Sequence, residues 1–550
     1  MTGLLQVGLL VVALAAAYKP LGDHMASVYT STGHWRVERA IYRVVRVDPG
    51  SEQRWTTYAA GVLGFSFAGI VLLYLIQRVQ PLLPFGFGRG AVEPGIAFNT
   101  AISFVTNTNW QSYVPEAVMG HSVQMLGLTT QNFVSAAVGM SVAVALVRGF
   151  ARTGGDRLGN FWVDLTRGVI RILLPIAAVS AVVLIAGGVV QSLAAGVDVT
   201  NPDGSSSTIP LAPAASQEAI KELGTNGGGI FNANSAHPFE NPNAFTNLVE
   251  LFLLLVIPVS LTRTFGVLVG DRRQGRVLLG VMTAIFAAVL TVTWLAEANA
   301  GGTAATAAGA AMEGKEQRFG IAGSALFSIA TTGTSTGAVN SMHDSFSGLG
   351  GGAQLLNMMF GEVAPGGVGS GLYGMLVLAV VAMFVSGLLV GRTPEYLGKK
   401  LGRREVTCAA VAILAMPTVL LLGTGIALTM PAELDRALNN SGPHGLSEVL
   451  YAYTSASNNN GSAFAGLTVT SPWFQSSLGL CMLLGRLVPI LAVLCLAGSL
   501  VAQPKVPRTA GTLPTTGPLF ASMLGGTVVL VAALTFIPAL ALGPIAEALA

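Results

Sequence analysis

Four short polar segments carry the residue types in this chain that are suited to binding an ion. They are Thr-Asn-Thr-Asn-Trp-Gln at 106–111, Thr-Asn-Gly-Gly-Gly at 225–229, Thr-Ser-Thr-Gly-Ala-Val-Asn at 334–340 and Asn-Asn-Asn-Gly-Ser at 458–462. Each lies between long apolar stretches. Irregular polar backbone persists at membrane depth only where it is buried in protein or lines a watery path. Four such loops around one axis would pool their backbone carbonyls, which is how a cation selectivity filter is made.

The composition predicts an all-α polytopic membrane protein. The 550 residues are 52% hydrophobic and only 10% charged, whereas soluble domains carry about 25% charged residues. The length suits about ten transmembrane helices, since each needs about 20 residues. The net charge of +3 gives no reason to expect nucleic acid as a partner. The three cysteines lie in apolar runs without CxxC spacing, which favours buried core residues over a metal site.

Ten apolar runs predict the membrane spans and their order. They lie near 3–19, 57–77, 122–147, 169–191, 247–270, 277–297, 354–390, 407–430, 473–500 and 518–545. The order is one lone span, four units of span, polar loop and span, and one closing span. The expected division is 1–56 for the first helix and an interfacial segment, 57–150, 151–272, 273–400 and 401–503 for pore repeats one to four, and 504–550 for the last helix.

The spacing of the loops supports internal repetition. Asn107, Asn226, Thr336 and Asn459 are 119, 110 and 123 residues apart. A near-constant period is the sequence signature of a repeated structural unit. Parallel repeats about an axis along the membrane normal are one plan on which transporters are built. We therefore expect the four units to surround a pseudo-fourfold axis, with one extra helix at each end.

Basic residues predict the orientation. They follow each unit in turn, at Arg148, Arg152, Arg157, Arg167 and Arg171, at Arg263, Arg272, Arg273 and Arg276, at Arg392, Lys399, Lys400, Arg403 and Arg404, and at Lys505 and Arg508. By the positive-inside rule these connections are cytoplasmic. The polar loops then enter from outside, and both termini lie outside. The basic segment 35–55 is expected along the cytoplasmic interface, and 198–213 is expected as an exposed outer loop.

Glycines recur in three of the polar loops. Gly227, Gly337 and Gly461 suit a strand that turns successive carbonyls inward, because such a strand needs backbone angles open mainly to glycine. Neighbouring Thr, Ser and Asn side chains can hydrogen-bond the backbone and brace it. The first loop offers Asn107-Thr108-Asn109 instead, and asparagine tolerates left-handed angles. The alternative, ordinary turns at helix ends, fits one loop better than it fits four related ones.

Two charged residues lie within apolar runs. Arg486 lies inside 473–500, and Glu362 precedes the glycine-rich run 365–371. Charges at membrane depth are costly and are usually functional. The glycine-rich run is expected to break its helix in mid-membrane and to serve as a gate or an exit. The alternatives are that Arg486 snorkels or pairs structurally, and that the break serves packing only.

Motifs of soluble enzymes occur without their required context. Gly309 to Lys315 fits GxxxxGK, but Glu316 replaces the magnesium-binding Ser or Thr, and the GxGxxG at 369–374 lies inside an apolar span. The GxSxG at 333–337 coincides with the third polar loop, and His343 and Asp344 nearby leave a membrane hydrolase as a weaker alternative. The chain also lacks the DKTGT sequence expected of an ion-pump ATPase. We therefore expect no bound nucleotide and no ATP-hydrolysing residues.

Long strings in the chain resemble one family closely, over essentially the whole length. They are 106–111, Gly-Gly-Gly-Ile-Phe-Asn-Ala-Asn-Ser-Ala-His-Pro at 227–238, Gly-Ala-Val-Asn at 337–340, Gly-Arg-Thr-Pro-Glu-Tyr-Leu-Gly-Lys-Lys at 391–400 and Asn-Asn-Asn-Gly-Ser-Ala-Phe-Ala-Gly at 458–466. They resemble the potassium-binding subunits (KdpA) of bacterial Kdp potassium-transporting ATPases. These subunits belong to a superfamily of potassium transporters with four fused channel-like repeats.

The resemblance implies roles for particular residues. The potassium filter would comprise Asn107, Thr108, Asn109, Gln111, Thr225, Asn226, Gly227, Ser335, Thr336, Gly337, Asn459, Asn460 and Gly461, with Gln111 at its lower part. The gate and exit path would comprise Glu362, Gly367, Gly369 and Arg486, with Arg486 beneath the filter and Glu362 near the start of a sideways passage. Some family members carry Cys where Thr336 stands, so the extra oxygen of threonine is a departure from their pattern.

The resemblance also implies a function and partners. The chain would bind and translocate K⁺ as the selective, non-catalytic subunit of an ATP-driven, high-affinity uptake complex in the bacterial inner membrane. Its partners would be a P-type ATPase subunit (KdpB-like), a single-span subunit (KdpC-like) and a very small membrane subunit (KdpF-like), all in the lipid bilayer. The alternative is a self-sufficient potassium channel or symporter of the same superfamily.

Overall fold

The computed structural model is a helical bundle, and it describes residues 2–299, 311–507 and 512–549. Gly309 and Arg508, named above, lie outside these ranges. Within the described ranges, ten helices are long and apolar enough to cross a membrane. The prediction of an all-α, multi-pass membrane protein is therefore confirmed.

The first half of the chain holds two peripheral helices and two units that each contain a short inserted helix. Its helices are α1 (Thr2–Thr30), α2 (Arg36–Val44), α3 (Trp55–Arg78), η1 (Gln80–Leu82), α4 (Pro94–Val105), α5 (Pro115–Val118), η2 (Val123–Thr129), α6 (Thr130–Ala151), α7 (Phe161–Arg167), η3 (Gly168–Leu173), α8 (Leu174–Ala186), α9 (Ala214–Leu223), η4 (Asn234–Ala236) and α10 (Ala244–Leu268). Two compound spans are continuous, because η2 runs into α6, and α7 runs through η3 into α8.

The second half holds two further units and the closing helix. Its helices are α11 (Arg272–Ala298), α13 (Gly320–Gly333), η5 (His343–Ser345), α14 (Gly348–Met359), α15 (Ser370–Leu389), α16 (Arg403–Leu428), α17 (Pro431–Ala437), α18 (Gly442–Asn458), α19 (Pro472–Ala502), α20 (Pro518–Leu540), η6 (Ala541–Ile545) and α21 (Ala546–Leu549). In the described residues the strands form three small antiparallel pairs, β1 (Gln53–Arg54) with β2 (Arg157–Gly159), β3 (Gly196–Thr200) with β4 (Ser206–Pro210), and β5 (Glu395–Tyr396) with β6 (Lys399–Lys400).

Small residues set which helices form the centre of the bundle. The most apolar window of the span containing α6 is 83% buried, whereas that of α1 is 6% buried. A Cβ on Gly139 of α6 would lie 2.3 Å from the Val368 carbonyl oxygen, and one on Gly149 would lie 2.9 Å from Ala497 Cα. Small residues allow such close approach of backbones in membrane bundles. α6 is therefore a central helix, and α1 packs on the outside against α10.

Four short helices lie between pairs of spans, and each one leads into a polar loop. They are α4, α9, α13 and α18, and their last turns are buried. The C-terminal end of a helix carries a partial negative charge because its last carbonyls have no partners within the helix. Four such ends directed at one region favour a cation there.

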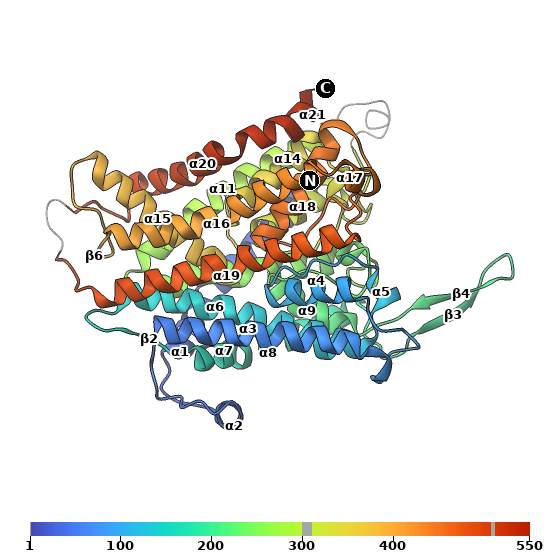
Figure 1. Cartoon of the computed structure of the whole chain (residues 1–550), viewed down its shortest axis with the longest axis horizontal. Coiled ribbons are helices and arrows are strands. Elements are labelled where there is room, and N and C mark those ends of the chain that lie inside the picture. The colour runs from blue at the N-terminus through green and yellow to red at the C-terminus, as the bar shows by residue number, and fades with distance from the viewer. Residues whose placement is uncertain (1, 300–310, 508–511, 550) are drawn as a thin grey trace.

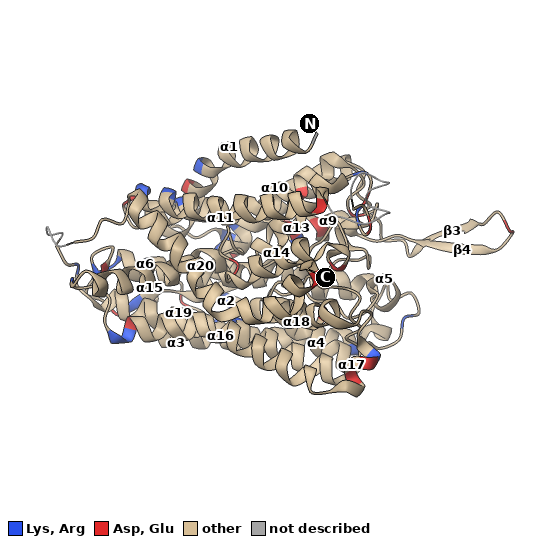
Figure 2. Cartoon of the chain, turned by 90° about the horizontal axis from the view of Figure 1, so that it is seen from above, with Lys and Arg blue, Asp and Glu red and all other residues tan. Residues whose placement is uncertain are grey.

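The distribution of charge along the bundle is uneven (Figure 2). Most lysines and arginines lie at one end of the long helices, and the β3–β4 hairpin projects from the other end. Both termini lie toward the end that carries the hairpin (Figure 1). The segment 198–213, expected as a loop, is largely this exposed hairpin, whose two strands pair from Gly196 with Pro210 to Thr200 with Ser206.

Three predicted spans differ from the observed helices. α1 extends to Thr30 instead of ending near residue 19, because Asp23 in its polar half accepts a hydrogen bond from Arg263 Nε (2.8 Å) on α10. The helix expected over 169–191 starts at Phe161, where the Asn160 side chain caps it. The run 354–390 is not one helix, because α14 ends at Met359 and α15 starts at Ser370. The predicted break in this run is confirmed.

Segment 35–55, expected at the interface, contains the amphipathic helix α2. Glu38 on its buried side is paired with Arg171 (Nη2 to Oε2, 2.6 Å), while Val37 and Val44 are exposed. The ion pair fixes α2 against the helix that contains η3 and leaves apolar side chains outward, as an interfacial helix requires.

Candidate ion-binding site

The four polar loops share one backbone conformation directly after their short helices. Asn107, Thr225, Ser335 and Asn459 have φ values of 67°, 46°, 56° and 61°. Residues other than glycine seldom adopt positive φ, so the same strain at four places marks equivalent positions. The equivalent residues are 118, 110 and 124 residues apart. The sequence pattern predicts Asn226 and Thr336 as the equivalents of Asn107 and Asn459. This prediction is one residue too far along the chain in the second and third loops.

Hydrogen bonds join each loop to the next and close a ring. In ring order they run from Asn107 Nδ2 to the Thr225 carbonyl (2.8 Å), from Gly337 N to the Asn226 carbonyl (2.7 Å), from Ser335 Oγ to the Asn459 carbonyl (2.9 Å), and from Asn459 Nδ2 to Thr108 Oγ1 (3.0 Å). Each loop therefore contacts the loop that follows it, and the fourth contacts the first. This closure is the pseudo-fourfold arrangement expected from the repeats.

Glycines allow the loops to approach one another around the axis. A Cβ on Gly227 would lie 2.5 Å from Gly337 Cα, and one on Gly337 would lie 2.8 Å from the Gly461 carbonyl carbon. A Cβ on Gly461 would lie 2.0 Å from the carbonyl oxygen of Thr108. Backbone therefore meets backbone at the centre of the ring, and a side chain at any of these three positions would displace its neighbour.

Asparagine side chains in the first two loops point away from the axis and brace the ring from behind. Asn109 stands where the other loops have glycine, and its Nδ2 donates to Asn132 Oδ1 (2.9 Å) on α6. Asn107 Oδ1 accepts a hydrogen bond from Ser135 Oγ (2.7 Å) and lies 2.6 Å from the Asn226 side-chain amide. These amides hold the loops to α6 and to each other, so backbone oxygens remain the groups available at the centre.

The first and third loops each contain a pair of threonines at equivalent positions, with their hydroxyl groups in contact. Thr106 Oγ1 lies 2.8 Å from Thr108 Oγ1, and Thr334 Oγ1 lies 2.9 Å from Thr336 Oγ1. The Thr336 hydroxyl is therefore tied back to its own loop.

Gln111 lies at the end of the ring away from Arg486. Its Nε2 donates to the Gly229 carbonyl (3.1 Å) and to the Tyr113 hydroxyl (3.0 Å). Gly229 is four residues beyond the strained residue of its loop, as Gln111 is in the first loop. The strained residues Ser335 and Asn459 line a cavity together with Arg486. The structure thus places Gln111 at the opposite end from the lower position expected for it.

The irregular segment 360–369 packs against the strained end of the ring. Gly366 N donates to the Gly333 carbonyl (2.7 Å), and Val368 N donates to Thr225 Oγ1 (2.9 Å). A Cβ on Gly367 would lie 2.9 Å from Ser335 Cβ, and one on Gly369 would lie 2.1 Å from the Gly139 carbonyl oxygen on α6. Gly367 and Gly369 are therefore needed for this segment to fit between the loops and α6.

Glu362 and Arg486 line a cavity of about 120 Å³ beside the ring. Glu362 Oε1 accepts a hydrogen bond from Asn460 Nδ2 (2.7 Å), which ties the segment to the fourth loop. Arg486 is 6% exposed, and in the described part of the chain it makes no ion pair or hydrogen bond. From the ring the cavity reaches Val531 and Thr535 on α20, so it leads toward the side of the bundle.

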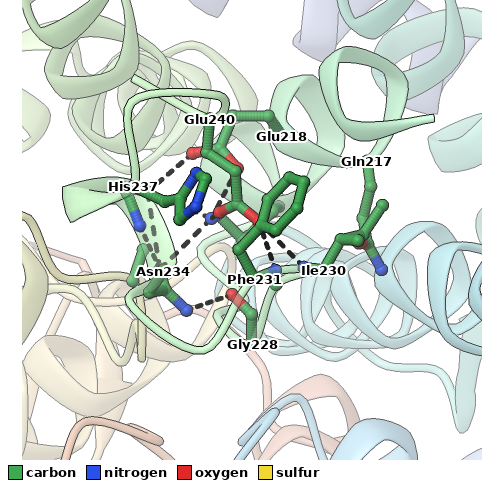
Figure 3. Close-up of polar contacts among 12 residues, drawn as sticks. Gln217, Glu218, Gly228, Ile230, Phe231, Asn234, His237 and Glu240 are labelled. Carbon is green, nitrogen blue, oxygen red and sulfur yellow. Dashed lines mark hydrogen bonds and ion pairs between the residues drawn. The ribbon is translucent and has the colours of Figure 1, made fainter. Parts of the chain in front are cut away.

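A buried ionic network braces the exit of the second loop (Figure 3). Glu240 Oε1 accepts hydrogen bonds from the backbone N–H groups of Ile230 and Phe231, both at 2.9 Å. Lys221 Nζ on α9 lies 3.0 Å from Glu240 Oε2, and Asn234 Nδ2 donates to the Gly228 carbonyl. The network therefore links the short helix, the loop and the segment after it.

The sequence interpretation missed both sets of bracing residues. Asn132 and Ser135 lie three residues apart, and therefore on one helix face, inside an apolar span, which was a detectable signal for a polar face turned inward. Lys221 and Glu240 had no such signal, because they lie outside the apolar runs and are 19 residues apart in the sequence.

Comparison with known proteins matches the whole chain to one family. The family model described as "Potassium-transporting ATPase A subunit" matches residues 8–549. A protein of Nocardia farcinica, called a potassium-transporting ATPase potassium-binding subunit, is 64% identical over 99% of this chain and 98% of its own length. One of Rhodococcus erythropolis with the same name is also 64% identical, with the same coverage.

A solved structure resembles the chain in fold. It is the crystal structure of the potassium transporter TrkH from Vibrio parahaemolyticus, with a TM-score of 0.52 over 89% of this chain and 95% of that chain. The two sequences are 14% identical, so this likeness bears on the fold alone.

Proposed function

We propose, on the premise that this chain belongs to the family of potassium-transporting ATPase A subunits, that it is the K⁺-selecting subunit of an ATP-driven uptake complex. One observation carries the proposal: four polar loops, each at the C-terminal end of a short helix, are hydrogen-bonded into a closed ring. Helix C-termini favour a cation, and a ring of backbone oxygens can replace the hydration shell of K⁺.

The proposed filter is the ring itself. Its residues are Asn107, Thr108, Asn109, Gln111, Thr225, Asn226, Gly227, Ser335, Thr336, Gly337, Asn459, Asn460 and Gly461. All thirteen are uncharged, so the ion would be held by dipoles. Of the polar side chains, those of Asn107, Asn109, Thr336 and Asn460 are tied to protein partners, which supports backbone coordination with the side chains as braces.

The proposed exit leads sideways beneath the filter. Arg486 is unpaired among the described residues and carries a positive charge beside the strained end of the ring, so it would repel a cation moving straight through. Glu362, which lines the same cavity, would attract the cation. Gly367 and Gly369 allow the broken segment to fit between the loops and α6. The reach of the cavity to α20 supports delivery of the ion to a neighbouring subunit in the membrane.

Energy coupling follows from tight binding. An ion held firmly enough to be scavenged at low concentration leaves slowly, and inward movement gains only about 2.3 kcal/mol per 100 mV of membrane potential. We infer that an ATP-hydrolysing P-type subunit drives release, with a single-span subunit and a very small membrane subunit as further partners. The relatives' name, potassium-binding subunit, supports a complex of several subunits.

The proposed orientation places the basic end of the bundle in the cytoplasm and both termini outside a bacterial inner membrane. It rests on the charge distribution of Figure 2 and on the positive-inside rule. The proposed repeats are 57–150, 151–272, 273–400 and 401–503, flanked by 1–56 and 504–550. Each contains one of the four short helices that lead into the ring, and one loop of the ring.

Flux of ⁸⁶Rb⁺ into proteoliposomes tests the function. We expect no flux from the purified chain alone and concentrative uptake once the copurifying subunits and ATP are present. Comparable passive flux from the chain alone would instead identify a self-sufficient channel and would contradict the proposal.

A further inference from the structure

Three glutamates behind the second loop converge in the protein interior. Glu218 and Glu222 lie on α9, and Glu250 lies on α10. Each is at most 1% exposed, and one carboxylate oxygen from each lies within 4.8 Å of the other two. They are thus fully buried and face one another across two packed helices.

Partners within the protein satisfy only part of this group. Glu218 is held by Lys221 Nζ (2.5 Å) and by the Ser235 hydroxyl (2.6 Å), which also donates to Glu222 Oε1 (3.2 Å). Glu222 Oε2 and both oxygens of Glu250 have no hydrogen-bond partner in the described part of the chain. Glu250 therefore points an unsatisfied carboxylate at the other two.

The charges in this region do not balance. Among the residues that the structure describes, Glu218, Glu222, Glu240 and Glu250 face one ammonium, that of Lys221. Unpaired buried charge is strongly unfavourable, so the group needs further positive charge or protons.

The unsatisfied carboxylate of Glu250 favours a metal ion over shared protons. A proton shared between Glu218 and Glu222 would still leave both oxygens of Glu250 without a partner among the described residues, whereas an ion held among all three carboxylates would satisfy them together. Ca²⁺ binds carboxylate oxygens at about 2.3–2.6 Å, so two oxygens on opposite sides of it lie near 5 Å apart. Mg²⁺ demands shorter, near-octahedral contacts and retains water.

We propose that Glu218, Glu222 and Glu250 form a binding site for a hard divalent cation, and that Ca²⁺ is the ion it takes. The ion would join α9 to α10 and, through Glu218 and Lys221, support the network that holds the second loop. The site does not rest on the proposed potassium function, because it depends only on carboxylate geometry and charge.

Calcium content and binding of the purified chain test the proposal. Protein in detergent is first dialysed against calcium-free buffer. Binding of ⁴⁵Ca²⁺ is then measured with an about 100-fold excess of K⁺ over Ca²⁺, and elemental analysis gives the metal content of the same protein. We expect about one saturable Ca²⁺ per chain that K⁺ does not displace and that raises the thermal unfolding midpoint.

Two variants separate this site from general effects. Glu250→Gln keeps the shape but removes a charge, and we expect at least about tenfold weaker Ca²⁺ binding. The matched control is Glu405→Gln, which neutralises another buried carboxylate, on α16, whose Oε2 accepts from Gly402 N (2.9 Å) and whose Oε1 accepts from Gln503. The control is expected to bind Ca²⁺ like the wild type. Where Glu250→Gln does not yield folded protein, Glu222→Gln takes its place.

Three results would overturn the proposal. They are no saturable ⁴⁵Ca²⁺ binding by the wild type, displacement of Ca²⁺ by K⁺ or by equimolar Mg²⁺, and undiminished binding in a folded glutamate variant. None of these results bears on Rb⁺ flux, so failure of the cation site and failure of the proposed transport function are distinguishable.

Discussion

Two neighbouring polar regions are buried at the centre of this protein, and they are built in opposite ways. The ring of four loops contains no charged side chain and is held by hydrogen bonds between uncharged groups. The network behind the second loop contains four carboxylates near the ammonium of Lys221, which is paired with Glu218 and Glu240. Figure 3 shows these two glutamates. Carbonyl dipoles can bind an ion strongly enough for it to enter the site and weakly enough for it to leave. Oppositely charged buried groups stay together instead, because separating them leaves a buried charge without a partner. The contrast suggests a transient site supported by a permanent one.

The largest effect is expected from removing the ammonium of the charged region. Lys221→Met leaves the carboxylates of Glu218 and Glu240 without their cation, and breaking a buried pair in this way costs about 3–5 kcal/mol. We expect a much lower thermal unfolding midpoint and little assembled protein. Adding Glu218→Gln to the same chain should restore part of the loss. Wild-type stability of the single variant would show that the network is not structural.

A charge placed in the uncharged region should alter binding more than folding. Gly227→Asp adds a Cβ that would lie 2.5 Å from Gly337 Cα, and a carboxylate next to the axis. We expect at least about tenfold weaker apparent K⁺ affinity, the factor that 1.4 kcal/mol gives, and poorer discrimination of Rb⁺. K⁺-dependent ATP hydrolysis by the assembled complex is the readout. Gly204→Asp is the control, since Gly204 also has positive φ but has open space around it.

Removing the charge below the ring should change transport and leave assembly intact. Arg486 has no partner among the described residues, so Arg486→Gln strands no carboxylate. We expect normal yield of the complex and a K⁺ leak in the absence of ATP, measured as ⁸⁶Rb⁺ efflux from proteoliposomes. Loss of assembled protein with no change in flux per complex would instead favour a purely structural arginine.

A single bracing bond of the ring should have a smaller effect. Ser335→Ala removes the donor to the Asn459 carbonyl (2.9 Å), and a hydrogen bond of this kind contributes about 1 kcal/mol. We expect K⁺ affinity to fall about fivefold. Ser205→Ala in the exposed hairpin is the control. An unchanged K⁺ dependence in Ser335→Ala would mean that the cross-loop bonds do not set the affinity.

The smallest effect concerns a third charged group, near the C-terminal helix. Hydrogen bonds that His444 donates to Asp344 and Glu547 raise the pKa of His444 to about 10. A histidine whose pKa is raised on folding contributes stability that is fully present below pH about 6.5 and is lost as the pH rises toward 10. We expect the unfolding midpoint to fall over that window in the wild type and to fall less in His444→Gln. Parallel pH profiles would contradict this role.

Composition and pattern were sufficient for the architecture. Ten apolar runs, four polar loops and the break near Pro365 are all properties of local sequence, and the observed helices agree with them. Family resemblance supplied the candidate site. The predicted register of the loops is off by one in two repeats, because residue type does not align them: Asn226 matches Asn107 and Asn459 in type, but the residues with the equivalent backbone angles are Thr225 and Ser335. Only backbone conformation shows which residues are equivalent.

Long-range contacts account for most of the rest. α1 extends past its apolar run because Asp23 meets Arg263, which lies 240 residues further along the chain. The position of Gln111 follows from a contact with Gly229, which the spacing within the first loop does not reveal. Glu250 was detectable, since it is an acid inside an apolar span, but its convergence with Glu218 and Glu222 depends on how α10 packs against α9.

The most direct test of the central claim is to locate a heavy potassium analogue by crystallography. Tl⁺ or Rb⁺ exchanged into crystals of the assembled complex gives anomalous density wherever a potassium-like ion binds. We predict a peak on the axis of the ring, between Thr108, Gly227, Gly337 and Gly461, that is absent from Gly227→Asp. A peak only among Glu218, Glu222 and Glu250, or none in the ring, would contradict the account.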